Sequence, residues 1–180
     1  RGLLSRSSAL LEQSGHAAID STFFERWQAS SHYLRRIDRK VDTLKITFLI
    51  DTADQAILDV HCSAKWPNDA KVGPKLAARN MDQLESLVAD KGYDSAAFRA
   101  QLRENGVRPL IKHRLYQPVD HAHNARMDTD RYNQRSLTES VNSAVKRSIL
   151  DSVSSRACFR QFREIVLAAS VHNVKRAIRA

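Results

Sequence analysis

Two segments rich in β-branched and large apolar residues, 45–51 and 56–63, are separated by only four residues. Segments of this kind joined by a short turn predict a β-hairpin. A strand is predicted before the hairpin at 15–22, and two more follow it at 84–90 and 107–113. Helices are predicted at 69–80, 96–105, 132–146 and 159–176. This order of strand, hairpin, helix, strand, helix, strand and two helices predicts an α/β fold, a mixed sheet flanked by helices.

Several single residues refine the boundaries of these elements. Asp94 or Ser95 is suited to cap the helix at 96–105, and Gly106 is suited to follow its end. Asp69 is a candidate cap for the preceding helix, although Pro74 could delay the start of that helix. Pro109 cannot donate a hydrogen bond to a neighbouring strand, so the strand at 107–113 is expected at an edge of the sheet.

Composition limits the classes of protein to consider. A chain of 180 residues with 42% hydrophobic residues fits one globular domain. Lys and Arg number 29 against 20 Asp and Glu, and this net charge of +9 favours a polyanionic partner. No apolar run approaches the ~20 residues that a membrane span needs, so no membrane partner is expected. The two cysteines, Cys62 and Cys158, exclude a CxxC metal site and are expected to be buried free thiols in a reducing compartment.

The segment 132–146 has the spacing of a single amphipathic helix. Its apolar side repeats every four residues, at Leu137, Val141 and Val145. Four residues fall within about 60° of one another on the other side: Tyr132, Arg135, Glu139 and Lys146. A carboxylate between cations suits phosphodiester chemistry, because carboxylates hold divalent metals and cations hold phosphate oxygens. An ordinary solvated surface helix explains this segment equally simply, and taken alone the segment favours that interpretation.

The same four residues match a family signature. Tyr132, Arg135, Glu139 and Lys146 reproduce the pattern Tyr-x2-Arg-x3-Glu-x6-Lys, which resembles that of DDE transposases of bacterial and archaeal insertion sequences. Two further stretches, 18–22 and 89–95, resemble motifs of the insertion-sequence-five and insertion-sequence-four types. All three motifs stand in the family's order, and the resemblance covers roughly residues 15 to 176.

The resemblance implies a ribonuclease-H-like fold and a set of site residues. Asp20, Asp90 and Glu139 would be the catalytic acids and would hold two Mg²⁺ or Mn²⁺ ions about 3.5–4 Å apart. Arg135 and Lys146 would bind DNA phosphates, and Tyr132 would donate a hydrogen bond to the DNA or stack beside it. Judged from the residues alone, Asp20 would be a turn or cap aspartate.

The implied function is that of a transposase catalytic core. It would cut double-stranded DNA at the ends of the element and join the freed 3′-hydroxyls to target DNA. It would act as a homodimer on DNA, in the cytoplasm, associated with the nucleoid. Two alternatives stay open: a ribonuclease-H-like nuclease without strand transfer, and a truncated or decayed fragment that binds DNA without catalysis.

Four parts of the chain allow competing interpretations. Residues 1–14 are expected to be the remnant of a preceding N-terminal region, before a catalytic domain at 15–180, because the chain begins with Arg1. Asp51 is the main rival of Asp20 as a metal ligand, although it is expected only to end a strand. His121 and His123 form a His-x-His pair without an evident third ligand, so a solvated loop is expected at 115–126. In the stretch 22–45 the aromatic residues suit either a strand of nucleic acid or the core, whereas the pairs Arg35-Arg36 and Arg39-Lys40 favour DNA. The basic and aromatic residues of this stretch are Phe23, Phe24, Arg26, Trp27, Tyr33, Arg35, Arg36, Arg39 and Lys40.

Overall fold

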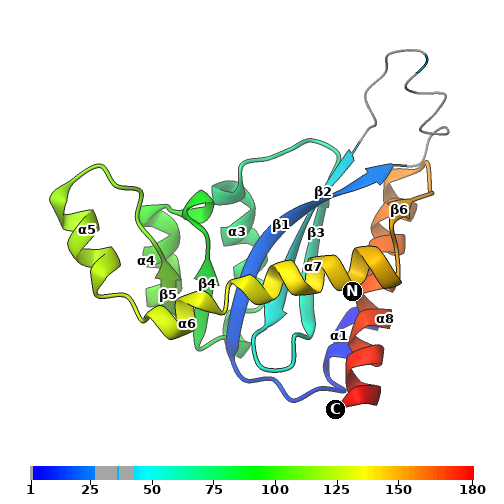
Figure 1. Cartoon of the computed structure of the whole chain (residues 1–180), viewed down its shortest axis with the longest axis horizontal. Helices are drawn as coiled ribbons and strands as arrows, with labels where there is room; N and C mark the ends of the chain where they lie inside the picture. Colours follow the sequence, from blue (N-terminus) through cyan, green and yellow to red (C-terminus); the bar gives the residue numbers. More distant parts are fainter. Residues whose placement is uncertain (1, 27–35, 37–42) are drawn as a thin grey trace.

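A computed structural model describes residues 2–26, 36 and 43–180, and within them a central sheet organises the chain (Figure 1). Its strands are ordered β3-β2-β1-β4-β5, and β6 pairs with β1. The strands are β1 (His16–Arg26), β2 (Thr43–Asp51), β3 (Ile57–Ser63), β4 (Ser86–Ala89), β5 (Arg108–Ile111) and β6 (Ser152–Val153). The pairs of β1 with β2 and of β2 with β3 are antiparallel, whereas β1, β4 and β5 run parallel. This mixed sheet between helices confirms the predicted ribonuclease-H-like architecture.

Helices cover both faces of the sheet. α1 (Gly2–Ser8), α7 (Ser136–Ser148) and α8 (Cys158–Arg179) contribute to one hydrophobic cluster, whereas α3 (Asp69–Ala77) and α4 (Ala96–Glu104) contribute to the other. The remaining elements are short: η1 (Met81–Gln83), η2 (Lys91–Tyr93), α5 (Pro118–Ala125) and α6 (Thr129–Asn133). Figure 1 shows α7 crossing the strands β1, β2 and β3.

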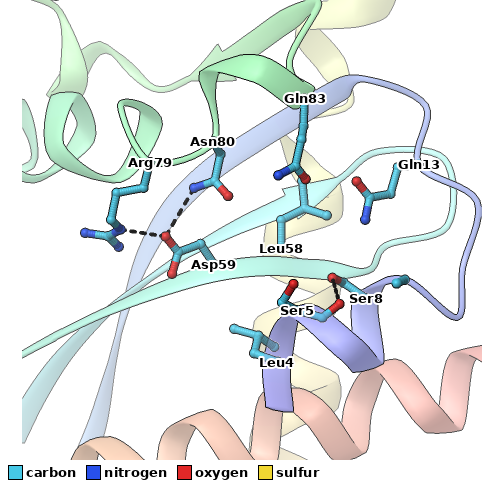
Figure 2. A pocket seen from close by; sticks show the side chains of 10 residues that line it. Leu4, Ser5, Ser8, Gln13, Leu58, Asp59, Arg79, Asn80 and Gln83 are labelled. Atoms are coloured by element: carbon cyan, nitrogen blue, oxygen red, sulfur yellow. Dashed lines mark hydrogen bonds and ion pairs between the residues drawn. The ribbon is translucent and has the colours of Figure 1, made fainter. Parts of the chain in front are cut away.

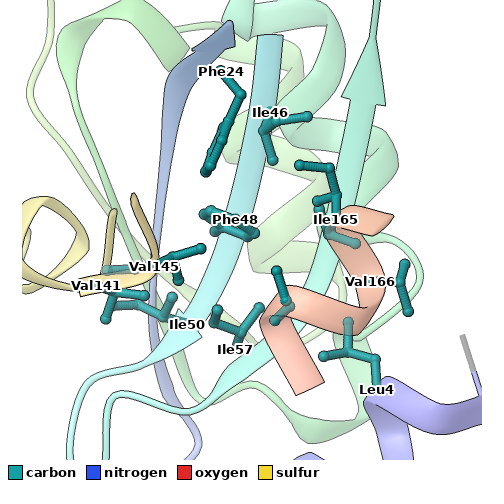
Figure 3. Close-up of a cluster of buried hydrophobic side chains, with 14 of the residues drawn as sticks. Leu4, Phe24, Ile46, Phe48, Ile50, Ile57, Val141, Val145, Ile165 and Val166 are labelled. Carbon is teal, nitrogen blue, oxygen red and sulfur yellow. The ribbon is translucent and has the colours of Figure 1, made fainter. Parts of the chain in front are cut away.

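Side chains point alternately to the two faces of the sheet along each strand, and this produces two hydrophobic clusters. In β1, Ala18 and Phe24 belong to the cluster beneath α7 and α8, whereas Ala17 and Ile19 belong to the cluster beneath α3 and α4. Successive side chains of a strand point to opposite faces, so this division fixes which face each later residue of β1 presents. Figure 3 shows the first cluster, in which Phe48 of β2 lies among side chains from the sheet and the covering helices.

The local predictions around the hairpin and the edge strand are confirmed. β2 and β3 pair as a hairpin, and Gln55 in the turn has a φ of 57°. β5 is an edge strand with Pro109 inside it. Ser95 is the N-cap residue of α4, and Gly106 follows its end with a φ of 76°, a conformation that suits glycine.

The prediction of one continuous helix at 132–146 is wrong in one respect, because the segment is divided between two helices. α6 ends at Asn133 and α7 begins at Ser136. Between them the backbone forms tighter i to i−3 hydrogen bonds, from Gln134 N–H to Arg131 O and from Arg135 N–H to Tyr132 O, both 3.1 Å. The change of direction places Tyr132 in the core cluster instead of on the polar side of α7.

Three further boundaries differ from the prediction. β1 continues for six residues beyond Asp20, so Asp20 lies in mid-strand instead of near its end. No strand was predicted between the helices at 132–146 and 159–176, but β6 lies there and pairs with the end of β1. The expected loop at 115–126 contains helix α5, which a reciprocal capping box between Gln117 and Asp120 stabilises. Pairing and capping of this kind depend on neighbours that hydrophobic periodicity does not report.

The first helix is integrated into the fold. Leu4 and Leu11 are buried, whereas Leu3 and Leu10 are exposed, and α1 packs against α8 and β3. Asn173 of α8 is fully buried and forms hydrogen bonds to β3 and to α1. Its amide accepts from Ile57 N–H at 2.7 Å and donates to Ile57 O at 2.9 Å and to Ser7 Oγ at 3.2 Å. The boundary placed at residue 14 stays a prediction.

The two cysteines and the aromatic residues of β1 differ in how far they are buried. Cys158 is exposed and Cys62 is half-buried, so the expectation of two buried thiols is wrong. Phe24 is fully buried in the core, whereas Phe23 is 46% exposed and packs edge-on against Trp66.

The predictions for Trp27, Tyr33, Arg35, Arg39 and Lys40 lie outside the described residues. No helix in the described part of the chain is long and apolar enough to cross a membrane.

Candidate active site

Asp20 and Asp90 stand side by side on neighbouring parallel strands. The register of β1 and β4 ends with the pair of Ile19 and Ala89. Asp20 follows Ile19 within β1, and Asp90 is the first residue after β4. Asp90 keeps an extended backbone, with φ −73° and ψ 165°. Adjacent parallel strands lie about 4.8 Å apart. Alternation therefore directs both carboxylates to the face that α7 covers, the face of Ala18 and Val88.

The environment of Asp20 disfavours its charged form. Burial raises the pKa of Asp20 above its usual value, and the negative charges of Asp69 and Asp90 add to the increase. A hydrogen bond from the Ser21 backbone and the positive charge of Arg135 act in the opposite direction. Carboxylates gathered at one point repel each other unless a cation joins them, and Arg135 supplies part of that positive charge here.

Arg135 and Glu139 form a pair at the start of α7. Arg135 Nη1 lies 3.8 Å from Glu139 Oε1, and the Glu139 side chain is 65% exposed. The charge of Arg135 also lowers the pKa of Asp20, so one guanidinium interacts with a helix carboxylate and with a strand carboxylate. Within the residues that the structure describes, no three His, Cys, Asp or Glu side chains are grouped closely enough to hold a metal ion. Asp20 and Asp90 are therefore brought together, and Glu139 stands apart with Arg135.

Tyr132 lies inside the site instead of on its surface. It is 9% exposed, and Lys112 Nζ lies 4.3 Å from the centre of its ring. Burial raises the pKa of the Tyr132 phenol, the charge of Asp90 raises it further, and Arg135 opposes them. Tyr132 is therefore an uncharged side chain that lies close to Asp90. The place of Lys112 beside the signature tyrosine is decided by the tertiary fold.

Lys146 lies near the C-terminal end of α7, close to Phe24 of β1. Its Nζ lies 5.3 Å from the centre of the Phe24 ring, a cation–π distance that fixes the ammonium above the sheet. Phe24 follows Asp20 by four residues on the same face of β1, roughly 13 Å along a strand. A hollow also runs along the outer side of α7 past Glu139, Ser143 and Arg147. Arg135, Lys146 and Arg147 thus place positive charge along the length of α7.

A buried polar network lies behind Asp20, on the opposite face of the sheet. Ser21 Oγ lies within hydrogen-bond distance of Asp69 Oδ1 (2.7 Å), Thr47 Oγ1 (2.8 Å) and Tyr93 OH (3.0 Å). Lys45 Nζ approaches the same Asp69 oxygen at 2.9 Å. Sequence reasoning missed these roles. Asp69 was interpreted as a possible cap, but the cap of α3 is Asn68, whose side chain accepts from Ala70 N–H. Only the presence of Ser21 and Tyr93 inside the two aspartate motifs hinted at a shared role.

The rival metal ligands have structural partners. Asp51 is buried at the far end of β2, where it accepts from Ser14 N–H and Ser14 Oγ at 2.8 Å and from Ala53 N–H at 2.8 Å. It ends its strand as predicted. His121 is exposed, whereas His123 stacks on His113 with ring centres 3.8 Å apart, so the His-x-His pair does not converge. His113 Nδ1 in turn pairs with Asp120 Oδ1 at 2.9 Å.

A cavity elsewhere contains a charged pair that links two elements of the fold. It has a volume of about 400 Å³ and lies between α1, β3 and the segment after α3 (Figure 2). Asp59 Oδ2 accepts from Arg79 Nε at 2.7 Å and from Asn80 Nδ2 at 3.1 Å. These pairs join β3 to the segment after α3. The cavity therefore has a structural explanation, and the acidic pair on β1 and β4 remains the candidate active site.

Comparison with known protein families gives a match over most of the chain. The family model described as "Transposase DDE domain" matches residues 12–174, which include both strand aspartates and the whole of α6 and α7. No curated protein matches the chain.

Proposed function

The chain belongs to the transposase DDE domain family, and we propose that it is the catalytic core of a metal-dependent DNA transposase of a prokaryotic insertion sequence. The single observation that carries this proposal is the juxtaposition of Asp20 and Asp90 on the β1–β4 register, beneath a helix that carries Glu139, Arg135 and Lys146. DNA is the proposed substrate, both as element ends and as target.

The two strand aspartates fit a divalent cation. Carboxylate oxygens are the ligands that Mg²⁺ and Mn²⁺ prefer. The pKa of Asp20 is raised mainly by burial and in smaller part by the negative charges of Asp69 and Asp90, and a bound cation would favour its charged form. Asp20 and Asp90 would hold Mg²⁺ or Mn²⁺, with two ions expected in the working complex. Glu139 would complete the ligand set only after it gives up its contact with Arg135. Bound cations would supply activation of the attacking hydroxyl and stabilisation of the leaving oxygen.

The other site residues bind and orient DNA. Arg135 and Lys146 hold phosphate oxygens on either side of the scissile bond, because the fold places them along one helix above β1. Tyr132, held in place by the core, borders the site beside Asp90 and limits how the DNA backbone enters. Contact of Arg135 with a phosphate removes it from Glu139, so DNA binding and assembly of the three carboxylates favour each other.

The larger assembly follows from the reaction. Paired cutting of two element ends needs two active sites, so we propose that the chain acts as a homodimer on DNA, associated with the nucleoid in the cytoplasm. The net charge of +9 supports binding to a polyanion. Tests of this proposal should therefore include DNA as well as metal.

The first experiment compares Asp90→Asn with the parent chain. Calorimetric titration with Mn²⁺, with and without duplex DNA, measures binding, and nicking of supercoiled plasmid measures cleavage. We expect Asp90→Asn to lose both. Asp82→Asn is the matched control, because Asp82 is exposed in η1 and its replacement removes one negative charge away from the site. Nicking by Asp90→Asn at the parent rate would refute the assignment of this site.

A second assay separates the proposal from its two alternatives. A labelled duplex with a free 3′-hydroxyl is incubated with plasmid and Mn²⁺, and joined products are counted separately from cleaved ones. Joined products support the transposase. Cleavage without joining supports a nuclease of the same fold. Binding to DNA without either product supports a fragment that has lost catalysis.

A further inference from the structure

Ser21 is the centre of the polar network on the face opposite Asp20. Its hydroxyl has a single proton but three partners within hydrogen-bond distance: Asp69, Thr47 and Tyr93. Asp69 Oδ1 also accepts from the ammonium of Lys45, so it acts as an acceptor. Ser21 therefore donates its proton to Asp69 and accepts protons from the hydroxyls of Thr47 and Tyr93.

The partners of Ser21 are held firmly. Thr47 and Tyr93 are each 1% exposed and Lys45 is 8% exposed. A Cβ on Gly73 of α3 would lie 2.8 Å from Tyr93 Cδ1, so the absence of a side chain at Gly73 makes room for the phenol ring. Burial raises the pKa of Tyr93 well above its usual value, which keeps its hydroxyl a donor. Ser21 and Asp69 are partly buried, and their closely packed partners restrict how far the network can shift.

The network ties the two aspartate motifs together just where the strand pairing ends. The last pair of β1 and β4 is Ile19 with Ala89, and the ladder does not continue to Asp20 and Asp90. Ser21 directly follows Asp20. Tyr93 closes the turn that Asp90 begins, with its N–H donating to Asp90 O at 2.9 Å. The hydrogen bond from Tyr93 OH to Ser21 Oγ is thus a second connection between the strands beyond the ladder.

We propose that Ser21, Asp69 and Tyr93 are positioning residues that fix the separation of Asp20 and Asp90 from behind the sheet. This inference rests on the proposed function, because it concerns the same pair of metal-holding aspartates. None of the three needs to contact metal or DNA. They act through the backbone of the residues that do, in the way that outer groups around metal sites orient the ligands.

The test measures Mn²⁺ affinity with DNA present in the parent chain, Tyr93→Phe, Ser21→Ala and the double variant. We expect each single variant to bind Mn²⁺ about tenfold more weakly. The double variant should be no weaker than Ser21→Ala alone, because Ser21→Ala already removes the hydrogen bond that Tyr93→Phe removes. Ser21→Thr keeps the hydroxyl and should bind nearly as the parent does. Tyr116→Phe is the matched control, because its side chain is 79% exposed.

The outcomes separate this inference from the proposed function. If the parent binds Mn²⁺, Asp20→Asn does not, and Tyr93→Phe and Ser21→Ala both match the parent, the positioning role is wrong and the proposed function stands. If the parent fails to bind, or Asp20→Asn binds equally well, the proposed function fails and this inference fails with it. Melting temperatures identify any variant that does not fold, and the other single variant with Ser21→Thr then decides the matter.

Discussion

The guanidinium of Arg135 lies 3.8 Å from the carboxylate of Glu139 and also lowers the pKa of Asp20. The positive charge of Arg135 therefore interacts with the helix carboxylate of Glu139 and with the strand carboxylate of Asp20. Three carboxylates directed at one point would repel each other, and here Glu139 is drawn to the arginine instead of to the two aspartates. The consequence is that Arg135 competes with any metal ion for the same negative charge.

Replacing Arg135 should therefore strengthen metal binding while weakening DNA binding. We expect Arg135→Gln to bind Mn²⁺ roughly fivefold more tightly at pH 8 without DNA, since one nearby positive charge costs about 1 kcal/mol or more. Calorimetry measures the metal, and fluorescence anisotropy of a labelled duplex measures the DNA. Arg147→Gln, an exposed arginine on the same helix, makes an equal change in net charge. Weaker Mn²⁺ binding by Arg135→Gln would contradict this competition.

Asp20 should lower the stability of the metal-free protein at neutral pH. Its pKa is raised in the folded chain, mainly by burial, so the folded state holds its proton to higher pH than the unfolded state. The free energy of unfolding therefore falls as pH rises through the window above the ordinary value of 3.8. We expect Asp20→Asn to raise Tm at pH 7 by about 2 °C in EDTA, a gain that shrinks towards pH 4.

The comparison for Asp20 uses circular dichroism melts of both chains across this pH range. Asp82→Asn, which removes an exposed carboxylate, should leave Tm nearly unchanged at every pH. Added Mn²⁺ should raise the Tm of the parent but not that of Asp20→Asn, since a ligand stabilises only the state that binds it. A lower Tm for Asp20→Asn at pH 7 would show that Asp20 contributes to stability instead.

Asn173 should be one of the most sensitive polar positions of the fold. Its amide satisfies both the N–H and the C=O of Ile57 on β3 and also reaches Ser7 of α1. Asn173→Ala leaves these buried groups without a partner, at a cost of about 2–4 kcal/mol in the free energy of unfolding. Urea denaturation measures the loss. Asn133→Ala, at an exposed position of α6, should change it by less than about 1 kcal/mol.

The two thiols should differ in reactivity. Burial, with a further contribution from Cys158, raises the pKa of Cys62 to about 11, so almost none of it is thiolate at pH 8. Cys158 is exposed. We expect a disulfide reagent to modify Cys158 about a hundredfold faster than Cys62 in the folded chain. Mass spectrometry of Cys158→Ser and Cys62→Ser assigns the two phases, and equal rates in the two variants would contradict the burial of Cys62.

The sequence by itself determined the order and type of most elements. The β-rich segments, the turn at 52–55, Gly106 and Pro109 each act through local backbone preferences, and these predict the hairpin, a helix end and an edge strand without knowledge of distant contacts. The resemblance of three motifs to one family also pointed to Asp20 and Asp90 as a pair. The fold then places them at neighbouring positions on β1 and β4.

Tertiary structure alone decided how the motifs meet. The turn between α6 and α7 moves Tyr132 into the core, away from the polar face that a continuous helical period predicted for it. The network around Ser21 joins residues that are 26 to 72 positions apart in the chain. Spacing along a sequence reports which side chains share a face of one element. Contacts between elements depend on how strands pair and helices pack, and these are settled only when the whole core is buried.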